Sequence, residues 1–209
     1  EAVIITGNLV NADIATLNSI SNQTSGVITA ALANVTAAQA DTLTTSGTDS
    51  ITITLDAGPA AASALNSLDS KTNVAIAAQS ITEIRGSIFE VEQARRSAGI
   101  TLDTDYQAFI SGTIGNPDIP KINELAAETS GVITAALANV TAAQADTLTT
   151  NGSDAITITL NSVPVSAPQL LSIDNKTSVA VNANSITQIN GTVAAIKAVY
   201  GSNGIAGLG

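Results

Sequence analysis

One 22-residue segment occurs twice in the sequence without a single change. The segment TSGVITAALANVTAAQADTLTT starts at Thr24 and again at Thr129, an offset of 105 residues. The same offset relates further matches outside these copies, which include ITITL at 51–55 and 156–160, Lys71-Thr72 and Lys176-Thr177, and Gly86 and Gly191. The chain is therefore two copies of one unit, and we expect one domain at residues 1–104 and a second at 105–209.

Inside each unit, short runs of β-branched residues recur at a finer interval. They begin near Val3, Val27, Ile51 and Val74, and again near Ala108, Val132, Ile156 and Val179. The runs are short and bounded by polar segments, which predicts strands; in ITITL the isoleucines fall on one face and the threonines on the other. The steps are 23 or 24 residues inside a unit. This spacing predicts a solenoid with four coils in each unit.

Apolar residues at helical spacing lie between these runs and predict short helices. Residues 14–20 carry one such pattern after Asn11, which we expect to be the N-cap, and Leu65 and Leu68 carry another. The strongest helix prediction is GSIFEVEQARRSAG, residues 86–99, with Gly99 ending the helix. We therefore predict an elongated α/β repeat solenoid with a parallel strand wall. An all-β solenoid is the alternative, favoured by the Thr and Val content.

The composition limits the chemistry available to the chain. Hydrophobic residues make up 44% of the sequence but aromatic residues only 2%, which suits thin, regular layers of small aliphatic side chains. There is no Cys, His, Met or Trp, so thiolate or imidazole metal sites and Ser-His-Asp or Cys-His catalysis are excluded. We expect no enzymatic activity and no resident cofactor.

The charge of the chain argues against two classes of partner. Seven basic residues against seventeen acidic ones give a net charge of −10, which is unsuited to a phosphate backbone. No run of 18 apolar residues occurs, so a membrane span is not expected. No leader of a charged segment followed by an apolar one is present either, and we expect the segment to belong to a longer protein.

Three groups of charged residues are candidates for function. Asp103 and Asp105 form an Asp-x-Asp pair in the longest predicted loop, where calcium is the ion that such oxygens would bind; a solvated loop is the alternative. A second group is expected to form a solvated helix face with weak ion pairs, with a partner-binding patch as the alternative, and it consists of Glu90, Glu92, Arg95 and Arg96. A third group is expected to cap helices or to add solubility, with paired carboxylates for hydrolysis as the alternative, and it consists of Asp13, Asp118, Asp69 and Asp174.

Several short motifs resemble the repeats of very large secreted surface proteins of marine cyanobacteria and related bacteria. The matching pieces are Leu65-Asn66-Ser67-Leu68-Asp69, Gly191-Thr192, Val199-Tyr200, Gly204-Ile205, Gly207-Leu208-Gly209 and Glu1-Ala2-Val3. The sequence departs from that pattern at ITLDTDYQAFISG, residues 100–112. The resemblance implies an extracellular or cell-surface location and a structural role, with no catalytic residue.

The two ends of a solenoid expose unpaired strand edges and apolar side chains unless polar caps close them. We expect no such caps here, because ordinary apolar positions lie at both ends: Val3, Ile4 and Ile5 at the start, and Val179, Val181, Ile205 and Leu208 toward the finish. The expected partners are further copies of the chain, joined head-to-tail in a filament, surface layer or adhesin stalk. The alternatives are an adhesin that binds cell-surface glycans and a carbohydrate-binding or carbohydrate-cleaving β-solenoid. The scarcity of aromatic residues argues against the carbohydrate functions.

Overall fold

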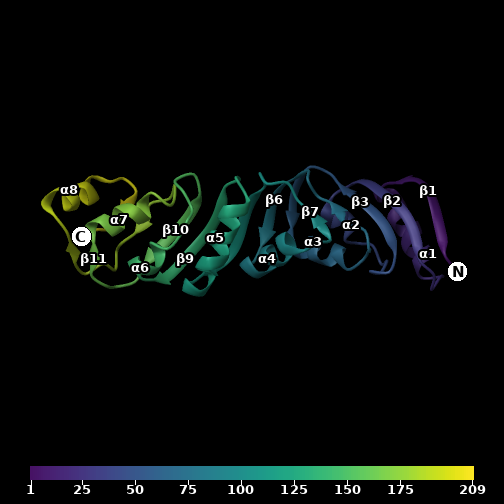
Figure 1. Cartoon of the computed structure of the whole chain (residues 1–209), viewed down its shortest axis with the longest axis horizontal. Helices are drawn as coiled ribbons and strands as arrows, with labels where there is room; N and C mark the ends of the chain where they lie inside the picture. Colours follow the sequence, from purple (N-terminus) through teal and green to yellow (C-terminus); the bar gives the residue numbers. More distant parts are fainter. The chain divides into compact units, whose positions relative to one another are not determined.

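Parallel strands alternate with short helices throughout the computed structural model, which describes every residue from Glu1 to Gly209 (Figure 1). The chain divides into two compact units, Glu1–Tyr106 and Gln107–Gly209. The predicted α/β class, with parallel sheets and short helices, is confirmed in both. The all-β alternative is wrong, because helices follow the strands in each unit.

The first unit contains seven strands and four α-helices. The strands are β1 Val3–Leu9, β2 Ile28–Val35, β3 Ser50–Leu55, β4 Gly58–Ala61, β5 Ile76–Ala77, β6 Ile81–Gly86 and β7 Ile100–Thr101. The helices are α1 Ile14–Ser21, α2 Ala37–Ala40, α3 Ala62–Asp69 and α4 Ile88–Arg96, with a 3-10 turn, η1, at Asn11–Asp13. The strands form one sheet in the order β1-β2-β3-β5-β7 and a second pair, β4-β6, all parallel.

The second unit repeats this arrangement. Its strands are β8 Gln107–Ile114, β9 Ile133–Val140, β10 Ala155–Leu160, β11 Val165–Ser166, β12 Val181–Asn182, β13 Ile189–Asn190 and β14 Ile205–Ala206. Its helices are α5 Ile119–Glu128, α6 Ala142–Ala145, α7 Ala167–Asp174 and α8 Val193–Gly201, with η2 at Asn116–Asp118. Inside this unit the parallel order is β8-β9-β10-β12-β14, and β11 pairs with β13.

The strand and helix phases follow from the placement of apolar residues. In β3, Ile51, Ile53 and Leu55 are buried while the threonines between them are exposed, as the alternation predicts. Leu65 and Leu68 of α3 are fully buried, and so are their counterparts in α7, Leu170 and Ile173. The predicted apolar faces of these helices are therefore confirmed, and each unit has an aliphatic core between its strands and helices.

Several predicted boundaries were wrong. Asn11 is not an N-cap: it is the first residue of η1, and Val10 occupies the cap, where its N–H donates to the Asp13 carboxylate (2.9 Å). α4 ends at Arg96 rather than next to Gly99. The loop predicted after α4 contains β7, and β4, β6, β11, β13 and β14 were also not predicted. Apart from the six-residue β6, these strands have only two to four residues, and main-chain pairing to another strand defines them more than their composition does.

Bulges interrupt the register at the same place in both units. β1 shifts against β2 between Ile4 and Asn8, where Gly7 has φ +91°, and β8 shifts against β9 around Gly112, at φ +79°. Positive φ favours glycine because it lacks a Cβ. In β2 and β9 the bulge residues are Asn34 and Asn139, with φ 53° and 57°; asparagine tolerates this region better than most residues.

Candidate functional site

The first strand of the chain presents apolar side chains to solvent. Ile4 of β1 is 76% exposed, and Val3, Ile5 and Leu9 are only half-buried. β1 pairs with β2 on one side only and ends its sheet. The residues 105 positions later in β8 are buried at three of these four places: Ala108, Ile110 and Ile114 are 1%, 3% and 7% exposed. These three positions are thus buried in the second unit and only half-buried in the first, while the counterpart of Ile4, Phe109, is itself 43% exposed.

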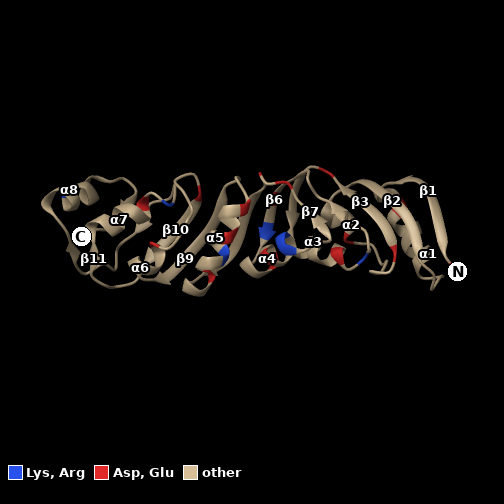
Figure 2. Ribbon diagram, in the orientation of Figure 1, with Lys and Arg blue, Asp and Glu red and all other residues tan.

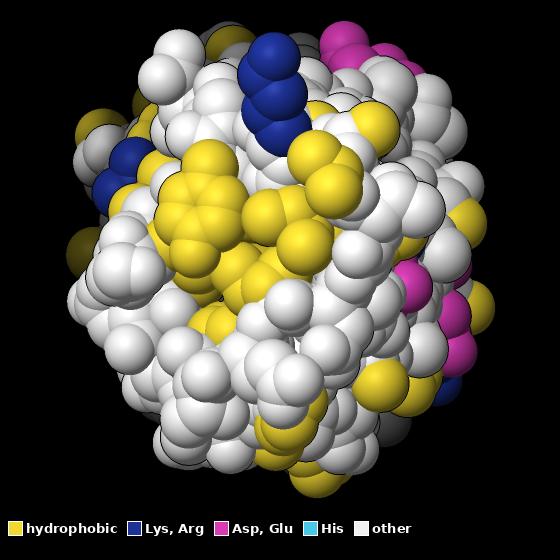
Figure 3. Space-filling model, turned by 90° about the vertical axis from the view of Figure 1, so that its left-hand side faces the viewer, with side chains coloured by type: hydrophobic (Ala, Val, Ile, Leu, Met, Phe, Trp, Pro, Cys, Tyr) yellow, Lys and Arg dark blue, Asp and Glu magenta, His cyan; other side chains and the backbone are white.

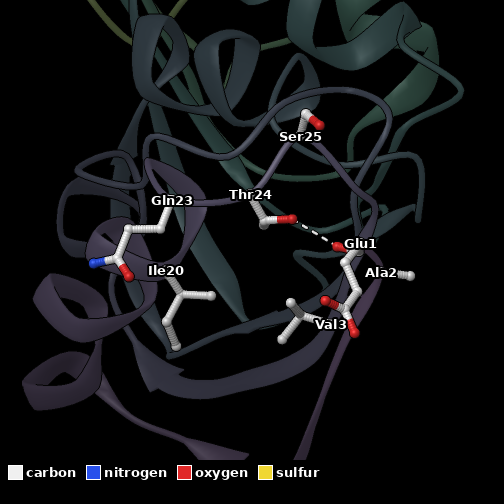
Figure 4. A pocket seen from close by; sticks show the side chains of 7 residues that line it. All are labelled: Glu1, Ala2, Val3, Ile20, Gln23, Thr24 and Ser25. Atoms are coloured by element: carbon white, nitrogen blue, oxygen red, sulfur yellow. Dashed lines mark hydrogen bonds between the residues drawn. The ribbon is translucent and has the colours of Figure 1, made fainter.

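A hollow of ≈ 490 Å³ lies beside the start of β1. Figure 4 shows its lining, which consists of Glu1, Ala2, Val3, Ile20, Gln23, Thr24 and Ser25. The Thr24 hydroxyl donates to the Glu1 carbonyl (2.6 Å) and accepts from the Gly26 N–H (3.0 Å), which ties the two segments together. Val3 and Ile20 give the hollow apolar side chains, and Gln23 and Ser25 are exposed. We call β1 together with these lining residues the head surface.

The last helix presents the second exposed apolar surface. In α8, Val193 is 85% exposed and Tyr200 59% exposed, although their counterparts in α4 are Ile88, which is 8% exposed, and Arg95, whose side chain is 2% exposed. Ile196 is half-buried, whereas its counterpart Val91 is fully buried. Figure 3 faces the side of the molecule on which α8 lies in Figure 1 and shows a contiguous apolar patch there. We call α8 together with β14 the tail surface.

The structure corrects the position of the last strand. Val179 and Val181 were predicted at the end of the strand wall, but β14 lies beyond them: Val181 is fully buried and pairs with Ile205. Val179 is half-buried and precedes β12. Ile205, in β14, is 8% exposed, and Leu208 is half-buried. Ile205 and Leu208 therefore belong to the terminal segment that contains β14, whereas Val179 and Val181 precede that segment.

Two buried threonines, Thr72 and Thr177, hydrogen-bond to the main chain of a strand 21 residues earlier, and we call them the corner residues. Thr72 Oγ1 accepts from the N–H groups of Ile51 (3.0 Å) and Val74 (3.1 Å) and donates to the Ile51 carbonyl (2.7 Å). Thr177 makes the same three bonds to Ile156 and Val179, at 3.0, 3.1 and 2.6 Å. Both threonines are 6% exposed. A buried hydroxyl thus satisfies main-chain groups on a strand that lies 21 residues earlier.

A buried carboxylate takes the corresponding place one turn earlier. Asp49 Oδ1 accepts from the Ile28 N–H (2.8 Å) and its Oδ2 from the Ser46 N–H (2.8 Å). Asp154 repeats this with Ile133 (2.9 Å) and Asn151 (3.0 Å). We did not single out Asp49, Asp154, Thr72 or Thr177 from the sequence as residues that hold the fold together. The signal was present, because each recurs at an offset of 105 residues.

The third group of acidic residues was predicted to cap helices, and two different arrangements result. Asp13 and Asp118 accept from the N–H groups of Val10 (2.9 Å) and Gly115 (3.3 Å), so they do cap η1 and η2. Asp69 instead accepts from the Ser97 hydroxyl (2.7 Å), and its counterpart Asp174 from the Ser202 hydroxyl (2.6 Å). These two carboxylates bind the end of one helix to the segment that follows the next.

The charged group on α4 is less solvated than predicted. Glu92 is 8% exposed and forms ion pairs with Arg95 (2.5 Å) and Arg96 (3.2 Å). The Arg95 side chain is almost fully buried, so the prediction of an entirely solvated face was wrong for Glu92 and Arg95. Glu90 belongs to the helix start, where the Ser87 N–H donates to it (2.8 Å). In Figure 2, basic residues mark the ribbon of β6 and α4, which carry Arg85, Arg95 and Arg96.

Two carboxyl groups have lowered pKa values. The pKa of Glu90 is lowered chiefly by the hydrogen bond from the Ser87 N–H, with a further bond from the Ser87 hydroxyl. The pKa of Asp118 is lowered chiefly by the hydrogen bond from Lys121 (2.8 Å). Both groups stabilise the ends of helical segments, and neither lies in a cluster of ionisable residues that could act as acid and base.

Asp103 and Asp105 are both exposed in the segment between β7 and β8. Asp103 accepts from the N–H of its neighbour Thr104 (2.7 Å). The structure contains no group of three or more carboxylates that could enclose a metal ion. The calcium site therefore stays a prediction that rests on two side chains.

Comparisons with known proteins give no assignment. No family model matches the sequence, and no curated protein or solved structure shows significant similarity to the chain. None of its helices has both the length and the apolar character needed to cross a membrane. Function must therefore be inferred from the surfaces themselves, of which the head and tail surfaces are the most distinctive.

Proposed function

We propose that the chain is a structural repeat segment of an extracellular or cell-surface protein, in which solenoid coils stack head-to-tail into a filament, surface layer or adhesin stalk. One observation carries this proposal. Three apolar positions that are buried in β8 are only half-buried in β1, and the position of the buried Ile88 in α4 is taken in α8 by Val193, which is 85% exposed. Exposed apolar patches of this kind mark surfaces that a partner covers.

The solenoid arrangement is supported by the regularity of the strand connections. Each parallel pairing in the main sheets joins a strand to the next one after an intervening segment, and the corner bonds of Thr72 and Thr177 span the same 21 residues. Units built this way bury their apolar faces only against neighbours, so the last strand at each end requires another unit. The head surface of one unit and the tail surface of another are the natural pair.

A joint of this kind is heterologous, because it pairs two different surfaces. Such joints generate open filaments when the rotation does not close a ring. The neighbour is either a further repeat of the same giant chain or a separate copy, and the physical contact is the same. The resemblance to secreted surface repeats and the aliphatic, nearly aromatic-free composition support the extracellular structural role.

Sedimentation of the full chain tests the proposal over micromolar to millimolar concentration. Short linkers give neighbouring modules effective concentrations in the millimolar range, so this range covers both a covalent array and separate subunits. We expect concentration-dependent, open-ended association, seen as linear particles by electron microscopy. Val193→Asp should abolish it because it places a charge in the tail surface.

Phe89→Asp is the matched control, because Phe89 is 68% exposed but lies outside the head and tail surfaces. It should leave association unchanged. A chain that stays monomeric at millimolar concentration would overturn the proposed function. Association that responds equally to both substitutions would show that the contact does not depend on the tail surface.

A further inference from the structure

The second unit loses burial along one strand and the helix that follows it. Four apolar positions that are buried in β6 and α4 are more open at their counterparts in β13 and α8, and the pairs are Ile81 and Ile186, Ile84 and Ile189, Ile88 and Val193, and Val91 and Ile196. β14 shows no such change, because Ile205 is 8% exposed and its counterpart Ile100 is 6% exposed. The surface that opens here is therefore formed by β13 and α8 rather than by the last strand.

The first unit loses burial at its first strand and first helix. Four apolar positions are half-buried in β1 and α1 and buried at their counterparts in β8 and α5, and the pairs are Val3 and Ala108, Ile5 and Ile110, Leu9 and Ile114, and Ile20 and Leu125. Each of the two open surfaces thus combines one strand with the helix that follows it.

β1 and β13 are both edge strands with a free row of main-chain groups. β1 pairs only with β2, and β13 only with β11, each in parallel. In a parallel strand the main-chain groups of successive residues face opposite neighbours. The Val3 N–H donates to β2 (2.9 Å), and the Gln188 carbonyl accepts from β11 (2.9 Å). The N–H and C=O groups of Ile4 and of Ile189 therefore point to the free edges.

We propose that the joint between copies is made by main-chain pairing: β13 of one copy lies parallel beside β1 of another, with Ile189 opposite Val3. The Ile4 N–H then donates to the Ile189 carbonyl, and the open apolar positions of the two surfaces cover each other. This pairing rests on the proposed function and adds the chemistry of its joint. In such strand addition the main-chain bonds supply the affinity.

A second copy of this chain fits both edges. Residues opposite each other in a parallel pair direct their side chains to the same face of the sheet. Ile189 and Val3 are both half-buried, so the register that satisfies the main chain also keeps both side chains on the inner face. Lys197 is the only charged side chain of α8, and Glu1 is the only one of the head surface. Their opposite charges favour the same partner.

Neither edge is protected against such pairing. Natural edge strands are blunted by proline, by charged side chains or by bulges. β1 is VIITGNL and β13 is Ile189-Asn190, with no proline and no charged residue in either. The bulge near Gly7 comes after Val3 and Ile4, whose register against β2 is regular. The beginning of β1 and the short β13 therefore present edges to which a strand can add.

Engineered cysteines test the register directly, because the chain has no cysteine of its own. With Ile189 opposite Val3, Asn190 lies opposite Ile4 at about 4.8 Å, which is within disulfide reach. A chain with Ile4→Cys mixed under oxidising conditions with a chain with Asn190→Cys should form the disulfide, identified by mass spectrometry of the linked peptides. Thr52→Cys is the matched control for Asn190→Cys, because Thr52 is exposed but lies in β3, which is paired on both sides.

A pair of substitutions at Ile4 tests the main-chain bond itself. Ile4→Pro removes the N–H that points to the free edge and should weaken association in sedimentation by about 10-fold or more. Ile4→Thr keeps the N–H and a β-branched side chain and should stay within about 3-fold of the wild type. Since this N–H does not bond to β2, the proline variant should keep the far-UV circular dichroism of the wild type.

The outcomes separate this inference from the proposed function. A disulfide to Gln188→Cys in place of Asn190→Cys supports the same two edges, with Ile189 opposite Ile5. If an associating chain links neither position faster than Thr52→Cys, or if Ile4→Pro associates like the wild type, strand pairing is overturned while head-to-tail stacking survives. A wild-type chain that does not associate at millimolar concentration overturns both.

Discussion

Replacing Thr72 by valine isolates the contribution of one buried corner hydroxyl. Valine has nearly the same shape, so the substitution removes the hydroxyl without opening a cavity. The N–H groups of Ile51 and Val74 then lose their acceptor, and the Ile51 carbonyl loses a donor. Each buried N–H left without a partner costs about 1–3 kcal/mol, so we expect a loss of about 2–5 kcal/mol in the free energy of unfolding of the first unit.

The repeat provides an internal replicate of this experiment. Thr177→Val removes the same three bonds from the second unit and should cost the same within about 0.5 kcal/mol, since the sites share no partner. Thr72→Ser keeps the hydroxyl and loses one methyl group, so it should cost only about 1 kcal/mol. Chemical denaturation gives the totals, and amide hydrogen exchange assigns each loss to its unit.

Two results would refute the reasoning about the corner. If Thr72→Val leaves stability within about 0.5 kcal/mol of the wild type, the hydroxyl does not satisfy the Ile51 and Val74 amides in solution. If serine is as damaging as valine, the methyl group rather than the hydroxyl stabilises the corner.

Three further predictions concern the core, the loop and the pH dependence. Leu68→Ala should cost about 2–5 kcal/mol in denaturant unfolding, because Leu68 is fully buried, while Val193→Ala at an 85% exposed position should cost little. If Asp103 and Asp105 bind calcium, millimolar Ca²⁺ should raise the melting temperature and Asp103→Asn should remove the effect; no response would leave the solvated-loop alternative. The lowered pKa of Glu90 means that its contribution is present above the unfolded pKa and is lost as the pH falls through the folded pKa, so Glu90→Gln should reduce the loss of stability measured below pH 4.5.

The sequence predicts the longer elements because their signals are local. The alternation of ITITL gives the phase of β3, and the spacing of Leu65 and Leu68 gives the buried face of α3. In contrast, β4 is GPAA, and β14 contains only Ile205 and Ala206. Nothing in such segments favours a strand, and they become strands because a neighbouring segment lies alongside.

The surfaces that we propose for function are harder to obtain from sequence. Ile5 and Ile110 occupy matching positions in similar apolar runs, yet Ile5 is half-buried and Ile110 is 3% exposed, because exposure depends on what packs against each strand, which no local pattern contains. The corner residues were visible as matches at an offset of 105 residues, but Thr72 bonds to Ile51, 21 residues earlier. Their role appears only when the fold brings these segments together.

Glycine at position 99 is required by a side chain rather than by the backbone. A Cβ at Gly99 would collide with the Asp69 carboxylate, and one at Gly204 would collide with Asp174, although neither glycine needs a positive φ. The same carboxylate accepts from Ser97, whose hydroxyl in turn accepts from the Gly99 N–H (3.0 Å). Gly99→Ala must therefore displace Asp69 and break its bond to Ser97.

We expect Gly99→Ala to lower the free energy of unfolding by about 1–3 kcal/mol, as other overpacking substitutions do. The test is a double-mutant cycle with Asp69→Ala. Once the carboxylate is gone, alanine at position 99 has room, and its lower chain entropy in the unfolded state should make it neutral or stabilising by about 0.4–1 kcal/mol. A penalty that is equal in both backgrounds would mean that the Asp69 side chain is not what excludes a Cβ here. The glycine would then be needed for a reason unrelated to the bond that joins α3 to the segment after α4.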